Sequence, residues 1–96
     1  MITINAIPKI IHGTSASRRL RAGNRFPAII YGGNHPPLFI ILDHNLVIKL
    51  QEKSKFFTEK LIIIVNNQQN SVKVKEVQHH PFKSKIIHID FIRVEL

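Results

Sequence analysis

The chain consists of short apolar runs separated by turn-forming residues, and this pattern constrains its fold more than any other feature. Apolar and polar residues alternate over 2–7, which is the period of a strand with one buried face. Further strand-like runs lie at 27–31, 38–42, 56–65, 71–80 and 86–94, and all of them except 71–80 contain isoleucine. Isoleucine favours strands because its side chain branches at Cβ. Six short strands joined by turns predict an antiparallel sheet that closes on itself.

Two segments predict helices. Thr14 or Ser15 can cap a first helix, which would end at Gly23. Asp43 can cap a second helix, whose apolar stripe consists of Leu46, Val47 and Leu50. The predicted fold is therefore a mainly β (α+β) domain over 1–96, a six-stranded antiparallel β-barrel with two or three short helices.

Three local features refine this prediction. The run over 38–42 is apolar at every position, which indicates a strand buried on both faces. The polar residues 66–70 predict a hairpin loop between two long strands. Val72 and Val74 share one parity whereas Val77 has the other, so we predict a β-bulge near Lys75 and Glu76.

Net positive charge is concentrated in the first part of the chain, where no acidic residue opposes it. The net charge is +8, the estimated pI is 10.3, and every acidic residue lies after residue 42. Arg18, Arg19, Arg21 and Arg25 stand within eight residues without a carboxylate among them. Arginine offers a planar fork of donors that matches phosphate oxygens or a guanine edge. We therefore predict a polyanionic partner, and the alternative is a solvated basic surface with no specific partner.

Several other functions find little support in the sequence. The chain has no cysteine, and its longest uninterrupted apolar run, 61–65, is far shorter than a membrane span. The N-terminus has no secretory signal pattern, so we expect a cytoplasmic protein. Gly32-Gly33 is not a nucleotide-binding motif, and no serine has the context of an activated nucleophile. We expect no enzymatic activity, no cofactor, no small-molecule substrate and no membrane contact.

Three side chains near strand ends have more than one interpretation. Tyr31 either stacks on a base or belongs to the core. His88 and Asp90 share one strand face and either read base edges or form a structural hydrogen-bonded pair. A zinc site formed by His79, His80, His88 and Asp90, with hydrolase activity, is a third alternative, but the spacing matches no closed metal motif and we expect no metal.

The runs SRRLRA at 17–22 and FPAIIYGG at 26–33 closely resemble the family of the 5S rRNA-binding protein numbered twenty-five in the bacterial large ribosomal subunit. The resemblance continues through Leu42-Asp43-His44, Val77-Gln78, His80-Pro81 and the ending HIDF at 88–91. It implies the short form of the family, with a six-stranded barrel. It also implies a structural constituent of the large subunit that binds 5S rRNA at loop E and is monomeric when free.

The resemblance implies RNA contacts for eight residues: Ser17, Arg18, Arg19, Arg21, Tyr31, Gln78, His88 and Asp90. Three further basic residues, Lys9, Lys75 and His79, extend this set. Thr14, Lys75, His79 and Phe82 differ from the residues usual in the family, which shifts charge within the site. A free-standing tRNA-binding or general RNA-binding barrel remains the alternative function. The predicted RNA-binding residues are Lys9, Ser17, Arg18, Arg19, Arg21, Tyr31, Lys75, Gln78, His79, His88 and Asp90.

Overall fold

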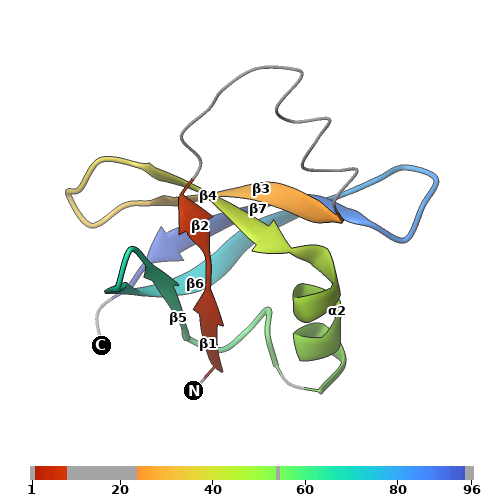
Figure 1. Ribbon diagram of the computed structural model, residues 1–96, viewed down its shortest axis with the longest axis horizontal. Coiled ribbons are helices and arrows are strands. Elements are labelled where there is room, and N and C mark those ends of the chain that lie inside the picture. The colour runs from red at the N-terminus through yellow and green to blue at the C-terminus, as the bar shows by residue number, and fades with distance from the viewer. Residues whose placement is uncertain (1, 9–23, 54, 95–96) are drawn as a thin grey trace.

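A computed structural model describes residues 2–8, 24–53 and 55–94 of the 96-residue chain (Figure 1). Within them a single sheet contains seven strands, and one helix follows the fourth strand. In chain order the elements are β1 (Ile2–Asn5), β2 (Ile7–Pro8), β3 (Arg25–Tyr31), β4 (Leu38–Asp43), α2 (His44–Lys53), β5 (Leu61–Val65), β6 (Gln68–His79) and β7 (Ile86–Arg93).

The N-terminal segment closes the sheet into a nearly complete barrel. The strand order is β1-β5-β6-β7-β3-β4-β2, so β1 and β2 form its two edges. These strands are separated only by Ala6, whose N–H donates to the Ile64 carbonyl at 2.9 Å. Figure 1 shows the continuous red segment running from β5 to β4. One continuous segment thus forms both edge strands, so the two ends of the sheet meet at Ala6. This arrangement leaves little open edge for another strand to join.

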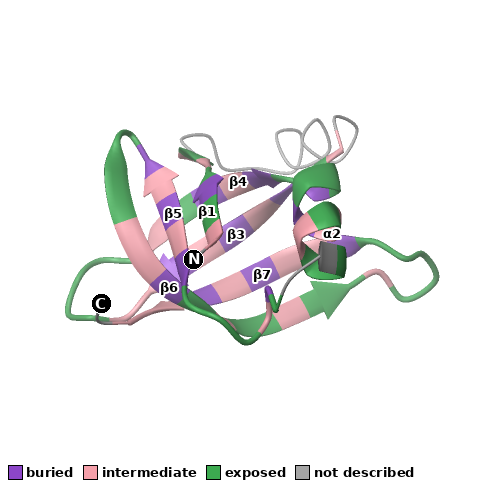
Figure 2. Cartoon of the chain, turned by 90° about the horizontal axis from the view of Figure 1, so that it is seen from below, coloured by how far each residue is buried: buried purple, intermediate pink, exposed green. Residues whose placement is uncertain are grey.

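The core lies inside this barrel and is formed by alternate residues of the strands. Burial alternates regularly along β3 and β5, and Figure 2 shows the resulting bands of purple and pink. The largest fully buried side chains are Phe26, Phe56 and Phe91, surrounded by isoleucine, leucine and valine. Because successive residues of a strand point to opposite faces, the other half of each strand forms the outer surface of the barrel.

Helix α2 lies beside one end of the barrel (Figure 2) and begins as the sequence predicts. The Asp43 carboxylate accepts hydrogen bonds from the backbone N–H groups of Asn45 at 2.9 Å and Leu46 at 3.4 Å. Val47 is fully buried, but the Leu46 side chain is 39% exposed, so its prediction as part of the buried stripe was wrong. The helix contacts the core along a narrow stripe, and a rotation of about 100° per residue moves Leu46 out of it.

The strand count and strand directions correct the predicted topology. The described residues form seven strands, not six, because the N-terminal run divides at Ala6 into two strands. The sheet is mixed and not wholly antiparallel, since β1 pairs in parallel with β5 and β3 in parallel with β7. Alternating hydrophobicity identifies a strand but carries no information on its partner's direction. The described part of the chain has one helix, and the first predicted helix lies outside it.

The start of one strand and the burial of another also differ from the prediction. Residues 56–59 form a turn, in which the Lys55 carbonyl accepts from Thr58 and Glu59, and β5 begins only at Leu61. Phe56 is nevertheless fully buried, so it contributes to the core from a turn and not from a strand. On β4 the Phe39 side chain is 44% exposed, which shows that this strand is buried on one face only.

The β5–β6 hairpin is tighter than the predicted five-residue loop. Asn66 and Asn67 alone form the turn, with φ angles of 51° and 64°, and residues 68–70 pair with β5. Two positive φ angles are typical of the turn that matches the twist of paired strands, and asparagine tolerates this conformation. The glutamines were therefore misinterpreted as loop because they are polar, whereas they belong to an exposed strand end.

Candidate nucleic-acid interface

Four predicted RNA-binding residues lie on the outer surface of three adjacent strands. Tyr31 ends β3, Gln78 lies on β6, and His88 and Asp90 lie on β7 between them. In the sheet register Gln78 is opposite His88, Asp90 is beside Ile29, and Tyr31 is beside Ile92. Their strand neighbours Ile30, Ile89 and Phe91 are fully buried. We call the surface formed by Tyr31, Gln78, His88 and Asp90 the outer face.

A histidine and a carboxylate lie close together at the centre of the outer face. His88 Nδ1 lies 3.0 Å from Asp90 Oδ1, and the two side chains are 29% and 28% exposed. The two atoms lack the alignment of a hydrogen bond, and Nδ1 has no hydrogen-bond partner among the described residues. Asp90 can accept hydrogen bonds from base amino groups, whereas the imidazole can donate through a ring nitrogen. The pair can therefore hydrogen-bond to both acceptors and donors on base edges.

A β-bulge in β6 determines which residues reach the outer face, as the sequence predicts. Val74 pairs with Phe91, but the next pair is Glu76 with Asp90, so the register shifts at Lys75. Because the extra residue reverses the parity, Val77 packs against the core and Gln78 is exposed. Lys75 itself is exposed at the bulge. The bulge is thus the feature that places Gln78 opposite His88.

Glu76 is an outer-face neighbour that the sequence interpretation missed. It is exposed and stands opposite Asp90, so two carboxylates lie at adjacent positions on neighbouring strands. Like charges at such positions repel each other and also repel phosphate. This part of the surface therefore favours hydrogen-bond donors over the nucleic-acid backbone. The alternating pattern of β6 places Glu76 correctly only once the bulge is known.

The remaining predicted residues divide into two groups. His79 is exposed at the end of β6, opposite Ile86, where the β6–β7 register shifts a second time. The other five lie outside the described residues: Lys9, Ser17, Arg18, Arg19 and Arg21. A cavity at the end of the barrel is lined by Arg25, Lys83 and Lys85. Arg25 belongs to the basic run noted in the sequence but was not among the predicted RNA-binding residues, and the two lysines were not singled out at all. The spacing of Lys83 and Lys85, two apart in a segment free of carboxylates, was the available signal.

His44 holds the start of β7 and thereby the strand that carries His88 and Asp90. It is 8% exposed, and its Nε2 accepts a hydrogen bond of 3.0 Å from the Ile86 backbone N–H. Its ring also makes an edge contact with Phe26, at a centroid distance of 6.0 Å. Burial lowers the pKa of His44, the nearby Lys85 charge lowers this pKa further, and Asp43 opposes the shift. All these effects except that of Asp43 favour the neutral ring that the hydrogen bond requires.

Two features are absent from the described residues. No group of three or more His, Asp or Glu side chains there is placed to hold a metal ion, so the alternative zinc site has no support in this part of the chain. No helix in the described ranges has the length and apolar character needed to cross a membrane.

The described residues form a small β-barrel in a basic chain, and four polar or aromatic side chains lie on its outer face. The model of the Ribosomal L25p family matches residues 4–91, and the chain belongs to this family. The resemblance found in the sequence is thereby confirmed. The chain is a ribosomal protein of the large subunit, an rRNA-binding and structural component of the translation machinery. In bacteria a protein of this kind is associated with the ribosome in the cytoplasm.

Proposed function

We propose that this chain binds 5S rRNA at its loop E region and stabilises the position of that RNA in the large subunit. In this proposal residues 1–96 act as one RNA-binding domain that is monomeric when free. The observation that carries the proposal is the outer face, where four groups able to contact bases lie on three adjacent strands.

The chemistry of the outer face suits an irregular RNA helix better than a regular one. The deep major groove of A-form RNA is closed to side chains, so regular duplexes are recognised mainly by shape. Loop E, as the family resemblance implies, is a helix of non-Watson–Crick pairs with a widened minor groove. Gln78, His88 and Asp90 would contact base edges there, and Tyr31 would pack on the backbone or a base. The carboxylates of Asp90 and Glu76 fit this role because they accept from base amino groups and repel phosphate.

The predicted basic residues would form a second group of contacts with the RNA. Lys9, Arg18, Arg19 and Arg21 would contact phosphates and groove edges, with Ser17 as an additional hydroxyl donor. Such contacts release counterions, so affinity should fall with salt, with each neutralised phosphate adding about −0.7 to −0.9 to the log–log slope.

A titration with two matched RNA fragments tests the proposal. The first fragment contains loop E, and in the second every non-Watson–Crick pair is replaced by a Watson–Crick pair at constant length. We expect the protein to bind the first fragment at least tenfold more tightly at the same salt concentration. Equal affinity for the two fragments would contradict recognition of loop E and would favour a general RNA-binding barrel.

A further inference from the structure

The β6–β7 loop (residues 80–85) presents an aromatic ring to solvent between basic residues. The Phe82 side chain is 91% exposed, the highest value among the exposed large apolar side chains of the described residues. A phenylalanine at this exposure contributes little to the core and costs free energy in water. Lys83 and Lys85 follow it, and the loop contains no carboxylate. This combination of a free aromatic face and uncompensated cations is typical of single-stranded nucleic-acid binding.

Internal hydrogen bonds hold the loop in this shape. The His80 N–H donates to the Lys85 carbonyl at 2.8 Å, and the Lys85 N–H donates to the Lys83 carbonyl at 2.7 Å. The Phe82 N–H donates to His80 Nδ1 at 3.1 Å, and the two rings meet edge-on with centroids 6.3 Å apart. These bonds fix the backbone on both sides of Phe82, which reduces the entropy lost when a ligand binds to the loop.

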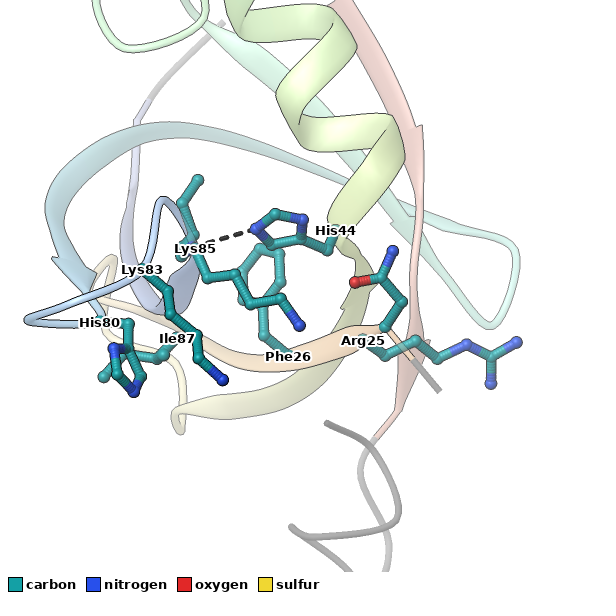
Figure 3. Close-up of a pocket in the computed structure, with 9 residues that line it drawn as sticks. Arg25, Phe26, His44, His80, Lys83, Lys85 and Ile87 are labelled. Carbon is teal, nitrogen blue, oxygen red and sulfur yellow. Dashed lines mark hydrogen bonds between the residues drawn. The ribbon is translucent and has the colours of Figure 1, made fainter. Parts of the chain in front are cut away.

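A basic cavity adjoins the loop. It has a volume of about 300 Å³ and is lined by residues from β3, the start of α2 and the β6–β7 loop, including Arg25, His44, His80, Lys83 and Lys85. Figure 3 shows the Lys83 and Lys85 side chains extending in the same direction, whereas Arg25 points away from them. Neither lysine forms an ion pair with a carboxylate in the described part of the chain. Two ammonium groups at one cavity provide favourable positions for phosphate oxygens.

We propose that the β6–β7 loop and this cavity bind one unpaired nucleotide of RNA, with its base stacked on Phe82 and its flanking phosphates at Lys83 and Lys85. This nucleotide site rests on the proposed function, since the β6–β7 loop joins the two strands that carry Gln78 and His88. An RNA bound at the outer face would therefore lie close to the loop. It adds a single-stranded element to the recognition of an irregular helix. Its chemistry is stacking and charge neutralisation, so it discriminates little among the four bases.

Titration with a short single-stranded RNA, followed by NMR, tests this site. The probe is a hexauridine oligonucleotide added to the ¹⁵N-labelled full chain. We expect the amide signals of His80 and of residues 82–87 to shift, Phe82→Ala to weaken this binding about tenfold, and Phe82→Tyr to retain it. The Lys83→Ala/Lys85→Ala double variant should reduce the steepness of the log–log salt dependence by about 1.4, or 0.7 for each lost phosphate contact. Lys49→Ala/Lys55→Ala removes the same charge from exposed positions elsewhere and serves as the control.

The outcomes separate this proposal from the previous one. Phe82→Ala should leave affinity for the isolated loop E duplex within about twofold, since that fragment has no unpaired nucleotide for the ring. Normal loop E binding without signal shifts at 80–87 would overturn the nucleotide site and leave the proposed function intact. Equal weakening by the two double-lysine variants would also overturn it, because net charge alone would then explain the binding. Loss of loop E specificity with intact hexauridine binding at the loop would contradict the proposed function only.

Discussion

Replacing His44 should destabilise the protein and loosen the strand that carries the outer face. His44→Ala leaves the Ile86 N–H, now bonded to Nε2 at 3.0 Å, without a partner in a buried position. An unsatisfied buried donor costs about 1–3 kcal/mol, and the lost edge contact with Phe26 adds about 0.5–1.5 kcal/mol. We therefore expect the free energy of unfolding to fall by about 1.5–4.5 kcal/mol. Urea unfolding followed by circular dichroism measures this change.

His44→Gln separates the hydrogen bond from the titration of the ring. The glutamine Oε1 can take the place of Nε2 as acceptor, but it does not ionise near neutral pH. Burial lowers the pKa of His44 in the folded protein below its unfolded value, which is near 6.5. The unfolded chain therefore binds more protons than the folded one as the pH falls below about 6.5. The stability that His44 contributes is complete above that pH and is lost as the pH falls toward the folded pKa.

Comparison of three proteins across pH 5.0–7.5 decides whether this reasoning holds. The wild type should lose more stability on acidification than His44→Gln, with a difference in slope of at most about 1.4 kcal/mol per pH unit. His35→Ala, at an exposed position, should follow the wild type and controls for the loss of a histidine. Parallel pH profiles for the wild type and His44→Gln would refute the assigned role of the buried ring, as would a loss below 0.5 kcal/mol for His44→Ala.

Three further substitutions test the fold around the site, each by urea unfolding. Arg93→Ala should lower the free energy of unfolding by about 1–3 kcal/mol, because Arg93 donates to the carbonyls of Gly32 at 2.7 Å and Pro36 at 2.8 Å. An unchanged urea midpoint would show that these hydrogen bonds do not stabilise the protein. Asp43→Ala should lower the free energy of unfolding by about 1 kcal/mol because it removes the helix cap, whereas Asp43→Ser should retain most of that stability. Equal losses for the two variants would argue against capping. Asn67→Gly should stabilise the hairpin by about 0.5 kcal/mol, since glycine adopts the φ of 64° more readily, and a destabilisation would contradict the assigned turn.

The barrel was predictable from the sequence, but the way in which the N-terminal segment closes it was not. Alternating apolar residues correctly located the strands, because burial of one face imposes a period of two. The bulge in β6 was also predictable, since Val77 has the wrong parity for an uninterrupted strand. The division of the N-terminal run at Ala6 left only a weak signal, because a single residue, Ile7, departs from the parity of Ile2 and Ile4. Strand directions likewise depend on contacts between distant segments, so the parallel β3–β7 pair could not be seen in local patterns.

The candidate site was predictable to a similar degree. Parity placed His88 and Asp90 together, and the structure brings them within 3.0 Å. Gln78 joined them through the predicted bulge. Glu76 was missed because the bulge was predicted only near Lys75 and Glu76, and the sequence did not show which of the two is the extra residue. His44 was missed as a positioning residue because its partner, Ile86, is 42 residues away and contributes only a backbone N–H.

Recognition of RNA by the outer face is tested most directly by one pair of glutamine variants on β6. Gln78 and Gln69 are both exposed on this strand, but only Gln78 lies opposite His88, whereas Gln69 pairs with Ile64 of β5. Fluorescence anisotropy with a labelled loop E fragment gives the affinity of each variant at fixed salt. Gln78→Ala should weaken binding by about 1–3 kcal/mol, or roughly 5- to 150-fold, while Gln69→Ala should remain within twofold of the wild type. Equal affinities for the two variants would contradict base recognition by the outer face.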